Sequence, residues 1–296
     1  MPLVFLTYAL FGSVFTVGKV TVYLLPPLFL TGFRYLLAGF FMLACILLSN
    51  GFVSLKKHLI LILKVAFFNV FLTNSLEFWA LQNMNSSKTA LFYSLSPFYS
   101  MIFAYYYLNE KMTQKKLLGL FIGFLGFLAL IFTSKNLSND NLTTSFSWPE
   151  MAANGAAIFS VFGWIYFKKL VYHDKFPAWH ANAYSFIIGG IISLLFSFFL
   201  EDHVSSMSLI EMSPQIGYIT LVHSIVCFSL YGLLLKKFTV TFLFFAGLLN
   251  PLFAAIYGFF FLGELIELNF IICLLAIALG LYLFFLEERN SETFAT

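Results

Sequence analysis

The chain has 296 residues, of which 61% are hydrophobic and only 10% carry a charged Asp, Glu, Lys or Arg side chain. Soluble globular proteins have about 25% charged and about 45–50% apolar residues, so this composition excludes an ordinary soluble enzyme and a nucleic-acid-binding module. The net charge of +3 is small, and three cysteines make no disulfide framework. We expect an all-α integral membrane protein. Its predicted partner is the lipid bilayer, and no nucleic-acid partner is expected.

Ten apolar segments follow one another along the chain. Each is about 17–23 residues long, which suits a hydrocarbon core about 30 Å thick at 1.5 Å per residue. Backbone groups inside lipid must pair within their own segment, so helices are predicted, and apolar pairs such as Ile187-Ile188 break the alternation of a β-barrel strand. The predicted spans cover residues 3–24, 28–48, 59–80, 89–108, 117–133, 149–167, 178–200, 214–235, 240–262 and 268–286.

Basic side chains gather on alternate connections between these spans. The connections on the same side of the membrane as the N-terminus carry eleven basic side chains, whereas the connections on the opposite side carry only Lys88 and Lys135. Because cytoplasmic loops carry the excess of Lys and Arg, we predict cytoplasmic N- and C-termini and a multi-pass protein of a bacterial inner membrane. The predicted inner connections are residues 49–58, 109–116, 168–177, 236–239 and 287–296.

The two halves of the chain resemble each other when the sequence is shifted by 154 positions. Pro97 then falls on Pro251, and Glu110 falls on Glu264. Five spans per half is an odd number, so the second copy is predicted to enter the membrane in the opposite orientation, as in many secondary transporters. The predicted domains are a first repeat (1–133), an outer linker (134–148), a second repeat (149–286) and a cytoplasmic tail (287–296).

Several short motifs occur in an order and spacing typical of one family. They are Leu25-Pro26-Pro27, Gly32-Phe33-Arg34-Tyr35, Ala80-Leu81, Ser94-Leu95-Ser96-Pro97, Leu108-Asn109-Glu110-Lys111, Asn250-Pro251 and Leu262-Gly263-Glu264. With them, the whole chain resembles the drug/metabolite transporter superfamily, EamA type. The resemblance implies a 5 + 5 inverted repeat of ten transmembrane helices that moves small metabolites. Glu77 departs from the neutral residue expected there, which leaves proton coupling or cation selectivity open.

Pro97 and Pro251 are predicted to lie near the bilayer midplane. Each proline removes a helical hydrogen bond and displaces the carbonyl group four residues earlier. A packing kink is one interpretation, but equivalent positions in two repeats favour a hinge beside a central substrate site. The polar side chains next to these prolines are candidate substrate contacts: Tyr93, Ser94, Ser96 and Asn250.

Three charged residues fall inside the first three predicted spans. A charge at mid-bilayer costs about 2.5–3.5 kcal/mol on insertion scales, so Lys19, Arg34 and Glu77 need a partner or a function. They are expected at similar depth. They could extend to the interface or form a structural ion pair. Alternatively, Lys19 and Arg34 attract a carboxylate or phosphate, with Glu77 as a competitor or proton carrier.

Four further side chains are candidates with two interpretations each. His223 could report proton coupling or act as a neutral, hydrogen-bonded packing residue. Tyr8, Trp79 and Trp164 could stack on a planar substrate, or pack like most aromatic residues in a chain with 20% of them. Glu110 is predicted to cap the helix that follows it.

Small-residue faces and missing motifs complete the prediction. The faces Gly119-x-x-x-Gly123 and Ala276-x-x-x-Gly280 predict close helix packing, with a homodimer contact as an alternative use. The sequence has no Walker loop and no His-Glu-x-x-His, so we expect no catalytic residue, metal or cofactor.

We predict a secondary transporter of a small polar metabolite, such as an amino acid. S-adenosylmethionine/S-adenosylhomocysteine uptake or exchange is the alternative substrate. A scaffold or a membrane-embedded enzyme is the alternative class.

Overall fold

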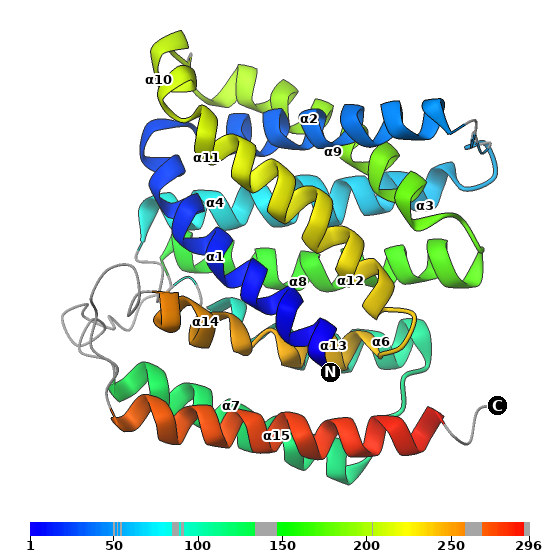
Figure 1. Cartoon of the computed structure of the whole chain (residues 1–296), viewed down its shortest axis with the longest axis vertical. Helices are drawn as coiled ribbons and strands as arrows, with labels where there is room; N and C mark the ends of the chain where they lie inside the picture. Colours follow the sequence, from blue (N-terminus) through cyan, green and yellow to red (C-terminus); the bar gives the residue numbers. More distant parts are fainter. Residues whose placement is uncertain are drawn as a thin grey trace.

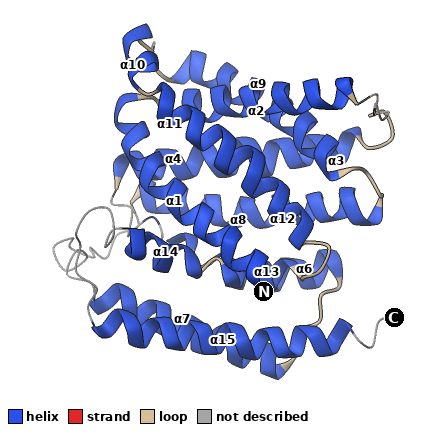
Figure 2. Ribbon diagram, in the orientation of Figure 1, coloured by secondary structure: helices blue, strands red, loops and turns tan. Residues whose placement is uncertain are grey.

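The computed structural model consists of helices and their connections, and no strand occurs among the residues that it describes (Figure 2). These are residues 1–49, 51, 53, 55–84, 89, 92–133, 147–202, 204–257 and 268–292. Most of the predicted linker lies outside the described residues, as do the end of the predicted tail, Lys88, Lys135 and Glu264.

The helices follow the predicted spans closely in both halves of the chain. The first half contains α1 (Pro2–Leu24), α2 (Pro27–Leu48), α3 (Leu59–Val65), the π-helix η1 (Ala66–Leu72), α4 (Thr73–Asn83), α6 (Ser96–Leu108) and α7 (Gln114–Thr133). The second half contains α8 (Trp148–Lys168), η2 (Lys169–His173), α9 (Ala178–Leu200), α10 (Ser206–Glu211), α11 (Ser213–Tyr218), η3 (Ile219–Cys227), α12 (Phe228–Leu234), α13 (Val240–Ala246), α14 (Leu249–Tyr257) and α15 (Leu268–Glu292).

Five helical stretches of the described chain are long and apolar enough to cross a membrane. The stretch Leu59–Asn83 joins α3, η1 and α4, and the stretch Ser213–Leu234 joins α11, η3 and α12. The other three are α1, α2 and α9. Proline stands in the first turn of α1 and α2, where its missing N–H has no helical partner to lose. The chain is therefore an integral membrane protein.

Two predicted spans, 89–108 and 240–262, are interrupted where the prolines predicted a break. A turn at Ser94-Leu95 precedes α6, whose first turn contains Pro97. A turn at Gly247-Leu248 separates α13 from α14, in which Pro251 is the third residue. Proline is tolerated in a first helical turn, so the chain restarts a helix at each proline instead of kinking a continuous one.

The last helix extends beyond the end of the tenth predicted span. The tail was expected from residue 287, but α15 continues to Glu292. Glu288 is only 2% exposed because it faces the start of α13. Glu288, which follows the apolar segment, is therefore packed against the rest of the protein.

Helices pair across the two halves, with α2 against α9 at one edge and α7 against α15 at the other (Figure 1). Glycines allow both approaches: a Cβ on Gly190 would lie 3.0 Å from the Gly32 carbonyl oxygen, and one on Gly280 would lie 2.5 Å from that of Gly119. A Cβ on Gly123 would lie 2.5 Å from the Phe245 ring. These small faces are occupied within one chain, which does not support the homodimer contact.

The predicted inner connections meet at one end of the molecule. His58 Nδ1 lies 3.2 Å from Asp174 Oδ2, and Lys168 Nζ lies 3.3 Å from Glu110 Oε1. At the other end, Glu201 accepts hydrogen bonds from the first backbone N–H groups of α2, at 2.7 Å from Leu28 and 2.8 Å from Phe29. A carboxylate is favoured there because those N–H groups have no helical partner.

Candidate functional site

Arg34 joins the two halves at the centre of the molecule. Its Nη1 donates to His223 Nδ1 at 2.9 Å, and its Nη2 donates to Asn74 Oδ1 at 2.6 Å. The guanidinium also lies over the rings of Tyr35 and Phe78, at 4.5 and 4.7 Å from their centroids. An arginine cannot accept a hydrogen bond, so His223 accepts through Nδ1 and carries its proton on Nε2 when neutral.

The hydrogen-bond partners of Arg34 lie in or next to π-helices: His223 belongs to η3, and Asn74 lies at the start of α4, directly after η1. In η1 and its junction with α4, the Thr73 side chain donates to the Phe68 carbonyl at 2.7 Å, and Asn74 Nδ2 donates to the Asn69 carbonyl at 2.8 Å. A π-helical turn changes the backbone register, and side chains satisfy carbonyl groups there. Asn74 is thereby held with its oxygen toward Arg34, while His223 projects from the middle of η3.

Aromatic rings from both halves surround the His223 side of this centre. The Trp164 ring stacks on Tyr231 with centroids 4.1 Å apart, and Phe11 meets His223 edge-on at 5.4 Å. Tyr8 packs edge-on against Tyr231 at 6.5 Å, and its hydroxyl donates to the Leu243 carbonyl in α13. Trp164 and Tyr8 are both buried, so they support this wall instead of facing open solvent.

Tyr93 and Asn250 lie next to the two helix breaks and remain half-buried. The Tyr93 side chain interacts with the Ser160 hydroxyl of α8 and lies near Tyr8. The Asn250 Oδ1 atom has no hydrogen-bond partner among the described residues. Ser94 and Ser96 are buried at 7% and 4% exposure, so they pack into the first break.

Glu77 lies among the side chains around Arg34 but takes no part in their hydrogen bonds. It is half-buried, and Arg34, Tyr35 and Tyr93 lie near it. Within the described chain, no hydrogen bond or ion pair engages its carboxylate. We call Tyr8, Arg34, Tyr35, Asn74, Glu77, Tyr93, Trp164, His223 and Tyr231 the central cluster.

Two predicted candidates lie outside the central cluster. Lys19 donates to the carbonyl groups of Leu81 and Met84 at the C-terminal end of α4, at 3.0 Å for Met84. A cation is favoured at this position by the helix dipole, and this contact replaces the expected meeting with Arg34. Trp79 is 39% exposed on the outer surface. Neither side chain is brought to Arg34.

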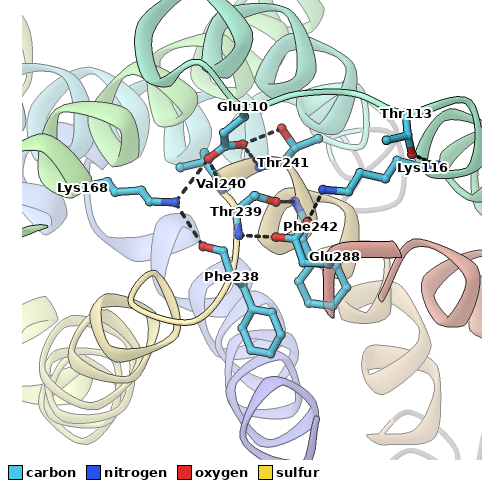
Figure 3. Close-up of polar contacts among 10 residues, drawn as sticks. All are labelled: Glu110, Thr113, Lys116, Lys168, Phe238, Thr239, Val240, Thr241, Phe242 and Glu288. Atoms are coloured by element: carbon cyan, nitrogen blue, oxygen red, sulfur yellow. Dashed lines mark hydrogen bonds and ion pairs between the residues drawn. The ribbon is translucent and has the colours of Figure 1, made fainter. Parts of the chain in front are cut away.

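A second polar cluster surrounds the first residues of α13 (Figure 3). Glu110 accepts from the backbone N–H of Val240 at 2.8 Å and from that of Thr241 at 3.2 Å, and Glu288 accepts from the N–H of Thr239 at 2.6 Å. Glu288 also pairs with Lys116 at 2.5 Å. Glu110 was expected to cap the helix that follows it, but it caps a helix of the other half.

This arrangement depends on how α6 ends. Asn109 has a φ of 55° at the C-terminal cap of α6, a left-handed conformation that asparagine tolerates better than most residues. The turn directs Glu110 away from α7 and toward α13. A cavity of about 10 Å³ beside Glu110, Lys116 and Thr241 has room for about one water molecule.

Sequence reasoning missed three members of the central cluster. Asn74 lies three residues before Glu77, a spacing that places both on one helical face and could have identified it. Tyr35 adjoins Arg34 within the quoted family motif. Tyr231 had no distinguishing signal, because 15 tyrosines occur in this chain.

Comparison with known proteins identifies this class of membrane protein. The model of the EamA-like transporter family matches residues 1–132 and 147–286. A crystal structure of another protein superposes with a TM-score of 0.76 over 98% of each chain at 16% sequence identity, which shows a shared fold. The chain belongs to the EamA-like transporter family.

Relatives with two different descriptions align with most of this chain. An S-adenosylmethionine/S-adenosylhomocysteine transporter of Chlamydia muridarum is 30% identical over 97% of this chain and 91% of its own length. The protein of the same description from Chlamydia trachomatis serovar D is 30% identical over 97% of this chain and 89% of its own. A probable amino-acid metabolite efflux pump of Salmonella typhimurium is 28% identical over 80% and 78% of the two chains.

Proposed function

We propose that this chain is a secondary transporter that exposes the central cluster to the two sides of a bacterial inner membrane in turn. Its two halves form an inverted repeat of five spans each, residues 1–133 and 149–286, joined by the outer linker 134–148. Both termini face the cytoplasm. Two similar halves that pack around one site can exchange two nearly equivalent arrangements, which is the basis of alternating access.

Equivalent irregularities in the two halves support the inverted repeat. The π-helices η1 and η3 begin at Ala66 and Ile219, and the turns before α6 and α14 begin at Ser94 and Gly247, so each pair differs by 153 positions. Helix contacts are also mirrored, because η1 packs on α8 as η3 packs on α1. The family model likewise matches two separate stretches of the chain.

Charge placement supports the proposed orientation. The hydrogen bonds and ion pairs of Lys168, Lys116 and Asp174 join four lysine-rich or C-terminal segments at one end of the molecule. Cytoplasmic connections carry the excess of basic residues, so this end is proposed to be cytoplasmic. The end that contains Glu201 is then the outer one.

The proposed substrate is a small polar metabolite that carries an amino-acid group. This chemistry is common to the compounds named for both groups of relatives: S-adenosylmethionine and S-adenosylhomocysteine contain an amino-acid group, as amino acids do. The main support for this proposal is the central cluster, which combines charged groups with aromatic rings from both halves of the chain. S-adenosylmethionine and S-adenosylhomocysteine are therefore the first substrates to test, and free amino acids are the second.

Counterflow in proteoliposomes tests this proposal. Vesicles loaded with unlabelled S-adenosylhomocysteine should transiently accumulate labelled S-adenosylmethionine from outside, because the exchange partner drives inward flux without ATP. Protein-free vesicles are the control, and a set of amino acids is run in parallel. Accumulation of an amino acid alone would reassign the substrate. A lack of counterflow with every compound would contradict transport and leave the scaffold and enzyme classes.

A further inference from the structure

We propose that Glu77 binds the positively charged group of the transported metabolite, an ammonium or a sulfonium centre. The inference rests on the proposed function and assigns to one residue the recognition of charge in the substrate.

The first observation is that the Glu77 carboxylate has no partner in the described part of the chain. Its neighbours on α4 are engaged, with Asn74 bonded to Arg34 and Phe78 packed under the Arg34 guanidinium. A carboxylate inside the bilayer is costly unless a cation lies beside it. Arg34 lies near Glu77 but forms no ion pair with it among the described residues, so the carboxylate is available to a cationic ligand.

The second observation is that Arg34 does not neutralise Glu77 by direct pairing. The two terminal nitrogens of Arg34 are held by His223 and Asn74 at 2.9 and 2.6 Å, and no ion pair between the described residues joins Arg34 to Glu77. Arg34 is also 0% exposed, whereas Glu77 is half-buried. Of these two charged residues, Glu77 is therefore the more accessible.

The third observation is the direction in which Glu77 faces. A helix turns about 100° per residue, so Glu77 and Trp79 lie about 160° apart around α4. Trp79 is on the outer surface, and Leu76 packs near Gly155 of α8. Glu77 consequently points inward, between α2 and α8, toward Tyr93.

The surroundings of Glu77 suit an organic cation. Tyr35 and Tyr93 lie near it, and Phe11 and His223 extend the aromatic wall. Aromatic faces attract ammonium and sulfonium groups through their ring quadrupoles, and a carboxylate supplies the opposite charge. Arg34 in this arrangement is a positioning residue that fixes α2, α4 and η3 around the carboxylate.

The test measures the binding of three related ligands to the purified full-length protein. S-adenosylmethionine has an ammonium and a sulfonium, S-adenosylhomocysteine has only the ammonium, and 5′-methylthioadenosine has the same nucleoside thioether with neither cation. The variant is Glu77→Gln, which removes the charge and preserves the shape. Glu211→Gln is the matched control, because Glu211 is exposed at the end of α10.

Glu77→Gln should weaken S-adenosylmethionine binding by about 10-fold or more, since a charge-assisted contact is lost, while 5′-methylthioadenosine binding stays within about twofold. An equal loss for S-adenosylhomocysteine assigns the ammonium, and an unchanged affinity for it assigns the sulfonium. Unchanged binding of all three ligands, or equal weakening of all three, overturns the proposal. Wild-type protein that binds none of them overturns the proposed substrate class, which is a separate failure.

A second measurement uses the wild-type protein, so its result does not depend on whether the Glu77→Gln variant folds. A hydrophobic carbodiimide reacts with carboxyl groups inside membranes, and mass spectrometry locates the modified residue. S-adenosylmethionine should slow the modification of Glu77 several-fold, and 5′-methylthioadenosine should not. Equal protection by both ligands would contradict charge recognition by Glu77.

Discussion

Arg34 shows how one side chain organises the centre of this protein. A fully buried guanidinium presents five N–H donors and no acceptor, so its surroundings must supply acceptors. His223 and Asn74 accept from its two terminal nitrogens and belong to opposite halves of the chain, whereas its buried Nε has no hydrogen-bond partner among the described residues. The rings of Tyr35 and Phe78 cover the faces of the guanidinium. The planar fork fixes three helical segments at once, which a flexible ammonium group would not do.

Replacing Arg34 with lysine should therefore impair transport although the charge is kept. A lysine cannot reach both acceptors in this geometry, and one buried polar group left without its partner costs about 1–3 kcal/mol. We expect lower thermal stability and a loss of counterflow of about tenfold or more. Lys236→Arg is the control, because Lys236 is exposed. Full activity of Arg34→Lys would show that the guanidinium geometry is not required.

At the level of elements, the N-terminus of α13 is held by acidic side chains from distant helices. Glu110 follows α6, and Glu288 lies in α15, so the start of α13 connects both halves at the proposed cytoplasmic end. Thr239 also accepts a hydrogen bond from the N–H of Phe242 at 3.1 Å. These acceptors satisfy backbone donors that a helix leaves unpaired, and they fix α13 immediately before its turn.

Two neighbouring lysines allow this arrangement to be tested with a matched pair. Lys116 is 4% exposed in its side chain and pairs with the buried Glu288, whereas Lys115 is 79% exposed and lies 3.7 Å from Glu287. Lys116→Met should lower the free energy of unfolding by about 3–5 kcal/mol, because it leaves a buried carboxylate uncompensated. Lys115→Met should change it by less than about 1 kcal/mol. Equal melting temperatures for the two variants in detergent would contradict the buried pair.

At the scale of the whole molecule, the pairing of equivalent helices produces three groups. The pair α2/α9 forms one edge, α7/α15 forms the other, and the interrupted helices lie between them (Figure 1). The irregular elements η1, η3 and the two helix breaks are therefore concentrated where a substrate site is proposed. Irregular backbone at membrane depth is tolerated where protein or a water-lined site satisfies it.

The inverted repeat predicts the sidedness of equivalent residues. Lys111 and Leu265 differ by 154 positions, and the proposed topology puts Lys111 in the cytoplasm and Leu265 outside. After replacement of the native cysteines, a membrane-impermeant maleimide should label Leu265→Cys in intact cells and Lys111→Cys only after permeabilisation. Asp202→Cys, at the proposed outer end of α9, is the positive control. Labelling of both test positions from one side would rule out opposite orientation of the halves.

Much of the architecture was predictable because a bilayer imposes a length and an apolar composition on each helix. The ends of α1, α2 and α9 lie within about a residue of the predicted spans. The helix breaks were predictable from Pro97 and Pro251, since proline cannot continue a helical hydrogen-bond ladder. The sequence could not reveal η1 and η3, because no residue type marks a π-helical turn as proline marks a break.

The pairing of polar groups required the tertiary structure. Lys19, Arg34 and Glu77 have similar predicted depths, and depth alone suggested that they meet. In the structure, rotation about each helix axis decides their partners: Lys19 binds the end of α4, and Arg34 binds His223 and Asn74. Glu110 likewise has a cap partner 130 positions away because the left-handed turn at Asn109 redirects it.

The sequence by itself determined the membrane class, the family resemblance, the positions of the helices and their breaks. These follow from composition and local backbone chemistry, which act over a few residues. Only the tertiary structure decided which side chains meet at the centre and which carboxylate has no partner there. Contacts between helices depend on their mutual rotation and register, which are set by packing across the two halves and not by local sequence.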